Sequence, residues 1–592
     1  MRICSTSTRL AIILLISIGC TILTSCSPSS DFKFPGQVIN STGRSDTPDT
    51  TQNPDDQTTP ANTLTAASLV TSISPEDGAF GVEPSVVVTA TFSEPMAAES
   101  INNTTFLVYR DFNNIPVEGE VLYDPATNST AFTPLSNFAL TSSFTITISK
   151  NIKTVSGVSP IDDFISQFTV REGGWNEAKS LTEHNTNAMP KVVRDIKGNE
   201  TVEWLIKRPL PSGFCPNPFG WSLVILPDEL SVSQYTNGEW STPQTISSPT
   251  SIPHFDITSH DIGIDNAGNI ISIWEQNNTI RSKTYTFNTH IWSKENMVSN
   301  SSGFDISKSK LAVASTGKTA AIWRKSNEFH IYNIYPNYYS PDSGWIKDDT
   351  LLPIANGADT ISAPDLSINA NGSVIAAWAE NNKIYANYAR SGKLNALNMT
   401  EIENIEDDEA KTPKISLNDS DNALAVWING NNVYSNLFTN ETWNPLSTFR
   451  LDNLEEPASD PQVVLTNSGN GMAVWIQLDE TAEDADRRKH LYARKFAEGE
   501  WEDEIHSICH RSTHASAPKI AMADGCDPAV VWVRDNVIWY NYYHLLGEAW
   551  DTESKLSQDR HVASEPYIFM SDNCSTSVVW VQDKNIMIKS LE

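Results

Sequence analysis

The sequence predicts an all-β protein, in which an antiparallel β-sandwich is followed by a β-propeller. Two observations support this prediction. Residues 67–172 contain short runs of alternating apolar and polar residues with turn residues between them, and residues 173–592 repeat a unit of four such runs. No copy of the repeat has the 3.6-residue period of an amphipathic helix, which excludes stacked helical repeats. The chain of 592 residues is also too long for one ordinary hydrophobic core.

The first 25 residues have the pattern of an export signal and are excluded from the fold. Arg2 and Arg9 make the start of the segment positive, and residues 10–22 form an apolar run too short to span a bilayer as a helix. The run is followed by Leu23-Thr24-Ser25-Cys26. This tetrapeptide resembles the lipobox of bacterial lipoproteins, a Leu and two small residues before a cysteine.

The resemblance implies that the chain is cleaved before Cys26 and that this residue carries the lipid. Its thiol would take a diacylglyceryl group and its amine a further acyl chain such as palmitate, which together anchor a protein stably. In Gram-negative lipoproteins, Ser27 in place of an aspartate favours the outer membrane; which side of that membrane is left open. The alternative is an ordinary secretory signal cleaved near Ser25.

Residues 26–66 are rich in Ser, Thr, Asp, Asn and Pro and contain almost no large apolar side chains. Such a segment cannot bury enough surface to offset the entropy lost on ordering, so it is expected to be a flexible tether. The net charge of the whole chain is −31. A chain this acidic is a poor candidate for binding nucleic acid, because phosphate contacts need clustered Lys and Arg.

Residues 67–172 are expected to form a sandwich of about a hundred residues. Three motifs within it are Pro75-Glu76-Asp77-Gly78-Ala79, Phe92-Ser93-Glu94-Pro95-Met96 and Phe132-Thr133-Pro134. Together they resemble the bacterial Ig-like domain of the SbsA (surface-layer) type. The resemblance implies a spacer or adhesive module and no catalysis.

The repeat of residues 173–592 is marked most clearly by tryptophan. The tryptophans that end the second run of each copy are Trp204, Trp274, Trp323, Trp378, Trp427, Trp475, Trp532 and Trp580. A second series in the fourth run comprises Trp175, Trp240, Trp292, Trp345, Trp443, Trp501 and Trp550, with Leu394 in the missing place. Tryptophans repeated this regularly are expected to be core residues between sheets. Four strands in each of eight copies predict an eight-bladed propeller.

The two ends of the repeat complement each other. The last copy stops after its third run, whereas residues 174–181 form a fourth run with no copy before it. We therefore expect this N-terminal strand to complete the last blade, because closure removes the exposed sheet edges. Seven blades are the alternative if residues 190–247 do not form a true blade.

No catalytic, metal-binding or cofactor-binding motif emerges from the sequence. The Asx-Gly turns, such as residues 195–199, are explained by hairpin chemistry. Cys509, His510 and His514 lack a second ligand pair at fixed spacing, so a loop with a disulfide is expected rather than zinc. The acidic stretches 401–409 and 479–486 lack calcium-loop spacing and are expected to be solvated.

Two features are candidate sites. An insertion in the first copy, residues 208–228, contains Phe214, Phe219 and Trp221, which could stack on a sugar or peptide if exposed. Alternatively, the insertion folds over the first blade and buries these rings. Cys526 and Cys574 each precede a second-run tryptophan by six residues in neighbouring copies, which predicts a disulfide between equivalent turns.

These features favour a membrane-anchored binding, adhesion or scaffold lipoprotein with a glycan or protein ligand. The lipid on Cys26 would be its contact with the membrane, the Ig-like module its spacer and the propeller its ligand platform. The alternative is a propeller hydrolase that acts on glycans outside the cytoplasm.

Overall fold

The computed structural model describes residues 69–591 apart from short internal gaps. The gaps are residues 112–113, 184–186, 196, 209–227, 249–256, 300–304, 348–350, 391–392, 406–408, 480–487, 510–513 and 546. The predicted signal segment 1–25, Cys26, the tether 26–66, and Phe214, Phe219 and Trp221 therefore lie outside the described residues. No helix among the described residues is long and apolar enough to cross a membrane.

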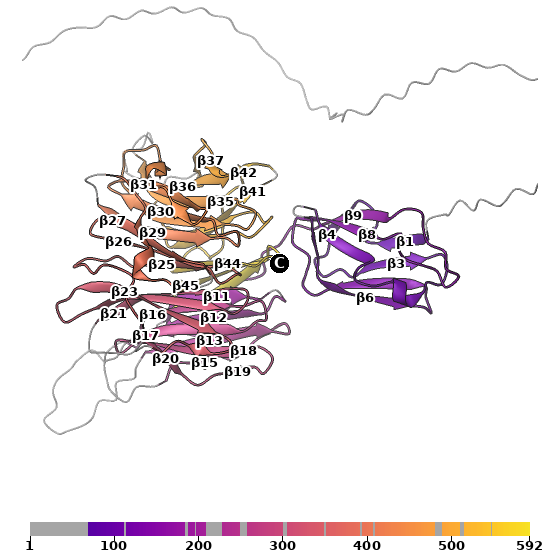
Figure 1. The fold of residues 1–592 in the computed structure, drawn as a ribbon, viewed down its shortest axis with the longest axis horizontal. Helices are drawn as coiled ribbons and strands as arrows, with labels where there is room; N and C mark the ends of the chain where they lie inside the picture. The colour runs from indigo at the N-terminus through magenta and orange to yellow at the C-terminus, as the bar shows by residue number, and fades with distance from the viewer. Residues whose placement is uncertain are drawn as a thin grey trace, which may run out of the picture. The chain divides into compact units, whose positions relative to one another are not determined.

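The N-terminal module is a two-sheet sandwich, which confirms the predicted fold (Figure 1). The first sheet has the order β1 (Val70–Ser74), β3 (Val88–Phe92), β7 (Ser129–Pro134) and β6 (Gly119–Asp124). The second has the order β2 (Ala79–Val82), β9 (Phe164–Val170), β8 (Ser143–Ile148), β4 (Phe106–Arg110) and β5 (Ile115–Pro116). A short 3-10 turn, η1 (Ala98–Ser100), precedes β4. Alternate residues of these strands point into one core, where Phe106 stacks on Phe132 with ring centroids 6.3 Å apart.

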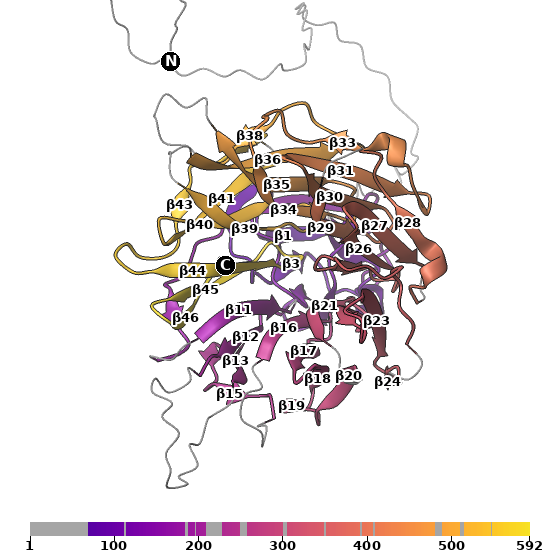
Figure 2. The same cartoon turned by 90° about the vertical axis from the view of Figure 1, so that its left-hand side faces the viewer.

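The remaining strands form eight antiparallel sheets around a common axis, so the eight-blade prediction is confirmed and the seven-blade alternative is wrong (Figure 2). The innermost strands are β11 (Asn187–Arg194), β16 (Ile257–Ile264), β21 (Ile306–Val313), β25 (Asp365–Ile368), β29 (Ala410–Leu417), β34 (Ala458–Leu465), β39 (Ala515–Ala521) and β44 (Ala563–Met570). Each contacts the next along the chain, and β44 contacts β11. The ring of blades is therefore closed.

The outer strands of the blades follow in chain order. The second strands are β12 (Glu200–Ile206), β17 (Ile270–Gln276), β22 (Thr319–Ser326), β26 (Val374–Glu380), β30 (Ala423–Asn429), β35 (Gly471–Asp479), β40 (Ala529–Arg534) and β45 (Thr576–Gln582). The third are β13 (Glu229–Thr236), β18 (Thr279–Thr286), β23 (Tyr332–Ser340), β27 (Lys383–Ala389), β31 (Asn432–Thr439), β36 (Arg488–Ala497), β41 (Val537–His544) and β46 (Asn585–Leu591).

The outermost strands are short. They are β14 (Glu239–Trp240), β19 (Ile291–Trp292), β24 (Gly344–Trp345), β28 (Met399–Glu401), β32 (Thr442–Trp443), β37 (Glu500–Trp501), β42 (Ala549–Trp550) and β10 (Lys179–Ser180). Five blades add a further short strand beside the third, namely β15 (Gln244–Thr245), β20 (Asn296–Ser299), β33 (Phe449–Arg450), β38 (His506–Ser507) and β43 (Ser554–Lys555). The 3-10 turns η3 (Ala396–Asn398) and η4 (Pro445–Ser447) lie in the fourth and fifth blades.

The last blade is closed by the strand that precedes the first. β10 pairs with β46, and Trp175 forms a further bridge with Leu591. A strand from residues 174–181 thus completes the sheet of β44, β45 and β46, as the sequence analysis expected. This pairing joins the two ends of the ring through backbone hydrogen bonds.

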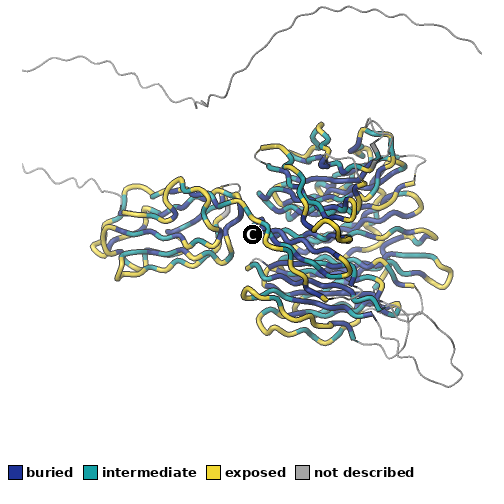
Figure 3. Tube along the Cα trace, turned by 180° about the vertical axis from the view of Figure 1, so that it is seen from behind, coloured by how far each residue is buried: buried dark blue, intermediate teal, exposed yellow. Residues whose placement is uncertain are grey.

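The tryptophans of the second strands form the core between blades. All eight are at most 1% exposed, and the buried parts of the chain run through the middle of every sheet (Figure 3). In the fourth blade, Leu394 is buried as expected, but it precedes the outermost strand β28 rather than lying in it. The outer tryptophans, such as Trp443, are partly buried at the rim.

Candidate functional site

One position of the innermost strand carries a polar or charged side chain in every blade. In blade order these residues are Lys191, Asp261, Lys310, Asp365, Lys414, Gln462, Lys519 and Tyr567, which we call the axial ring. Seven of the eight are partly exposed and Asp261 is buried. Because the innermost strands surround the axis, these side chains gather charge at the centre of the propeller. Four lysines and two aspartates give the ring a charge of +2 in a chain of net charge −31.

A repeated distortion of the backbone precedes the axial ring. The residue two positions before the ring residue has a positive φ in six blades, namely Met189, Lys308, Thr412, Asp460, Ala517 and Glu565. In the same blades the pairing with the second strand shifts register before the ring residue, so each innermost strand contains a β-bulge. Bulges redirect the following side chain, and non-glycine residues at positive φ cost about 1 kcal/mol or more each. Strain repeated at one position is typical of functional sites.

Five blades of the axial ring form an alternating chain of charges. The Nζ atom of Lys191 lies 2.6 Å from Asp261 Oδ1, and Lys310 and Lys414 lie 3.9 and 3.8 Å from Asp365 Oδ1. Both aspartates also accept a hydrogen bond from the backbone of the next blade. Asp261 accepts from the N–H of Leu311, and Asp365 accepts from that of Ile415. These carboxylates therefore tie blades together and offset two of the three lysine charges.

The other three blades lack this compensation. The side chains of Gln462, Lys519 and Tyr567 have no hydrogen-bond or ion-pair partner among the described residues. Burial, together with the positive charges of Lys414 and Lys310, lowers the pKa of Lys519 to about 8. Burial and the charge of Asp261 raise the pKa of Tyr567 to about 12, so its hydroxyl remains a donor at neutral pH.

The axial ring is not among the sites predicted from the sequence, although a signal for it exists. In six blades the ring residue directly follows a proline, as in Pro413-Lys414 and Pro518-Lys519. Proline within a strand is typical of bulges, because it donates no ladder hydrogen bond. Aligning the repeat on these prolines, rather than on the tryptophans, would have identified the ring position.

The predicted pair of cysteines forms a disulfide. Cys526 and Cys574 are bonded, with their Cα atoms 5.3 Å apart, in the first-to-second-strand turns of neighbouring blades. Arg110 of the sandwich contacts these turns. It donates to the carbonyls of Asp524 and Gly525 at 2.9 and 3.0 Å, and its Nη2 atom lies 3.3 Å from the Sγ atom of Cys574. The disulfide thus holds together two turns that receive a side chain from the N-terminal sandwich.

The disulfide expected in the loop of Cys509 is not formed. Cys509 is a free thiol buried in the core between two blades, so this prediction is wrong. It accepts a hydrogen bond from the backbone of Leu491, and burial raises the pKa of its thiol. His510 lies outside the described residues, and His514 is exposed. No group of three or more potential metal ligands occurs within the ranges that the structure describes.

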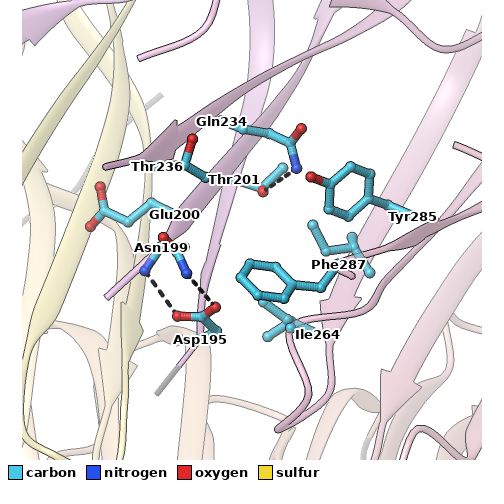
Figure 4. A pocket seen from close by; sticks show the side chains of 11 residues that line it. Asp195, Asn199, Glu200, Thr201, Gln234, Thr236, Ile264, Tyr285 and Phe287 are labelled. Carbon is cyan, nitrogen blue, oxygen red and sulfur yellow. Dashed lines mark hydrogen bonds between the residues drawn. The ribbon is translucent and has the colours of Figure 1, made fainter. Parts of the chain in front are cut away.

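A small pocket between the first two blades is structural in character (Figure 4). Asp195 on its wall closes a first-to-second-strand turn by accepting hydrogen bonds from Asn199 N–H and Asn199 Nδ2 at 2.9 and 2.8 Å. Asp265 closes the equivalent turn of the next blade in the same way. These bonds confirm the expected hairpin chemistry and leave Asp195 committed to its own turn.

A buried network nearby also contains groups that resemble catalytic ones. Glu203 bonds His260 Nδ1 at 2.6 Å and accepts a hydrogen bond from Ser272 Oγ at 2.5 Å. The other ring nitrogen of His260 bonds the carbonyl of Met189 at 2.7 Å. All three side chains are essentially inaccessible, so no substrate can reach Ser272. The network links the first two blades rather than forming a catalytic site.

Comparison with protein families recognises the N-terminal module. Residues 64–170 match the family of bacterial Ig-like domains. The chain matches no curated protein. A protein of unknown function from Dyadobacter fermentans DSM 18053 is similar in structure, with 10% identity, a TM-score of 0.31, and coverage of 50% of this chain and 96% of that one.

Two solved propellers are also similar. The Dos1 propeller has 9% identity and a TM-score of 0.41, with 71% of this chain and 95% of that one covered. The WD40 domain of SCAP from fission yeast has 8% identity and a TM-score of 0.41, with 70% of this chain and 98% of that one covered.

Proposed function

We propose that this chain is an exported, lipid-anchored binding protein that contacts its ligand at the axial ring. In this proposal Cys26 carries the lipid in the bacterial outer membrane, the Ig-like module is a spacer, and the propeller is the ligand platform. The observation that carries the proposal is the axial ring itself. Eight separate strands each place a polar side chain at the axis, and six of them do so after a strained bulge. Polar side chains that are partly buried need polar partners, so a ring of them around the axis supports contact with a polar ligand.

The proposal includes no catalysis. Most glycoside hydrolases use two carboxyl groups that are free to exchange protons or to attack. In the axial ring, Asp261 and Asp365 are each held by lysines and by a backbone N–H. The two aspartates of the axial ring therefore do not supply such a pair.

The lipid anchor predicts that Cys26→Ser abolishes membrane attachment. In cells fed radiolabelled palmitate, the full-length protein should be labelled and should sediment with the outer-membrane fraction. The Cys26→Ser variant should carry no label and leave that fraction. As a control, Cys509→Ser removes a thiol from the folded region and should retain the label. Equal labelling of the Cys26→Ser variant and the unchanged protein would refute the anchor.

The binding role predicts a ligand on an array of glycans and peptides. Full-length protein in detergent should bind one class of ligand saturably, with affinity retained when the loop residues Phe214, Phe219 and Trp221 are each replaced by alanine. Loss of binding in these variants would assign the ligand to the inserted loop instead. If no ligand in the array binds saturably and the protein instead pulls down other envelope proteins, a scaffold role is favoured.

A further inference from the structure

The axial ring is asymmetric in how its charges are satisfied. From the first to the fifth blade, lysines and aspartates alternate and every lysine has a carboxylate within 4 Å. From the sixth to the eighth blade, Gln462, Lys519 and Tyr567 offer an amide, an ammonium and a hydroxyl with no acceptor among the described residues. In one arc of the ring every charged side chain thus has a partner of opposite charge, and the other arc consists of donors without an acceptor among the described residues.

We propose that Gln462, Lys519 and Tyr567 form a site for a single oxyanion group, a carboxylate, sulfate or phosphate carried by the ligand. This inference rests on the proposed binding role and names the chemistry of the ligand. An ammonium flanked by two neutral donors can bond all oxygens of such a group, and hydrogen bonds to charged groups are about twice as strong as neutral ones. Asp261 and Asp365 are engaged by the lysines of the other arc and by backbone N–H groups, and the charge of Asp460 also acts on Lys519.

The energetics of Lys519 agree with this assignment. Its pKa is lowered to about 8 by burial and by the positive charges of Lys414, Lys310 and Lys191, against which Asp460 acts in the opposite direction. Keeping the amine of Lys519 charged therefore lowers the free energy of unfolding of the protein. Between pH 8 and the ordinary pKa of a lysine, 10.5, the unfolded chain binds more protons, so stability rises with pH in that window. A bound anion would remove this cost and raise the pKa of Lys519.

A substitution at Lys519 should separate stability from binding. Lys519→Gln keeps a polar side chain and removes the unfavourable charge, so the variant should fold and unfold at an equal or higher temperature than the unchanged protein at pH 7. The same substitution should weaken anion binding about tenfold or more, because one charge-assisted bond is lost. Such opposite effects are typical of residues kept for function. Lys555→Gln is the matched control, since Lys555 is exposed and paired with Asp559.

The experiment uses full-length protein in detergent and four probes, namely sulfate, phosphate, digalacturonate and its neutral counterpart digalactose. In isothermal titration, at least one acidic probe should bind to the unchanged protein and to the Lys555→Gln variant. The Lys519→Gln variant should lose this affinity. Digalactose should bind to none of the three proteins. The acidic probes distinguish a sulfate or phosphate ligand from a uronate. Affinity should also fall as the pH rises above about 8, where Lys519 loses its proton.

Three outcomes would overturn the inference. Acidic probes could bind equally well to Lys519→Gln, which would place the anion elsewhere. A neutral ligand from the array could bind with no acidic probe doing so, which would leave the binding role intact and remove the anion site. Finally, no probe and no array ligand could bind, in which case the proposed function fails together with the inference.

Discussion

Replacing Trp427 by alanine will destabilise the propeller by about 3–5 kcal/mol. The ring of Trp427 is fully buried between the fourth and fifth blades, where it packs against Ile375, Ala377 and Ala425. Its indole N–H also donates to Glu403 at 2.9 Å, so the substitution leaves both a cavity and a buried carboxylate with one donor fewer. Denaturant unfolding followed by circular dichroism measures the loss as a lower midpoint.

Trp443→Ala is the matched control for this prediction. Trp443 packs on Phe438 in the same blade, but it lies at the rim and is partly exposed. Its removal opens space that water can fill, so we expect less than half the cost of Trp427→Ala. Equal costs at the two positions would contradict the view that the second-strand tryptophans are the main core residues.

Removing the disulfide will have a comparably large effect. Cys526 and Cys574 are 48 residues apart, and in the chain-entropy account a loop of this length contributes about 4 kcal/mol to stability. The Cys526→Ser and Cys574→Ser double variant should therefore unfold at a clearly lower denaturant concentration. The loss also frees the two turns that Arg110 contacts.

Reductant provides the internal control for the disulfide. It should lower the unfolding midpoint of the unchanged protein toward that of the double variant and leave the double variant unaffected. If the double variant and the oxidised protein unfolded at the same midpoint, the cross-link would have no stabilising role.

Much of the fold could be predicted from the sequence, because the same residue type marks the same strand position in every copy of the repeat. Trp204 and its seven equivalents fix the second strand of each blade, and the unmatched run at residues 174–181 predicts the partner of the last sheet. The pairing of Cys526 with Cys574 followed from their equivalent positions in neighbouring copies. In each case one residue type recurs at one structural position.

The axial ring could not be predicted in the same way, because its residue type changes from blade to blade. Lys414, Gln462 and Tyr567 share a backbone position but no chemistry, and the contact between Lys310 and Asp365 exists only once the third and fourth blades pack together. The free thiol of Cys509 was mispredicted for a related reason. Its burial depends on packing between blades, which spacing along the chain does not reveal.

The central claim is that the ligand is bound at the axis of the propeller. Hydroxyl-radical footprinting of the full-length protein, with and without the best ligand from the array, tests this claim most directly. We expect the ligand to protect Tyr567 on the innermost strand of the last blade and to leave Phe80, an 81% exposed residue of the sandwich, unprotected. Protection of Phe80 with unchanged oxidation of Tyr567 would contradict the account and assign binding to the Ig-like module.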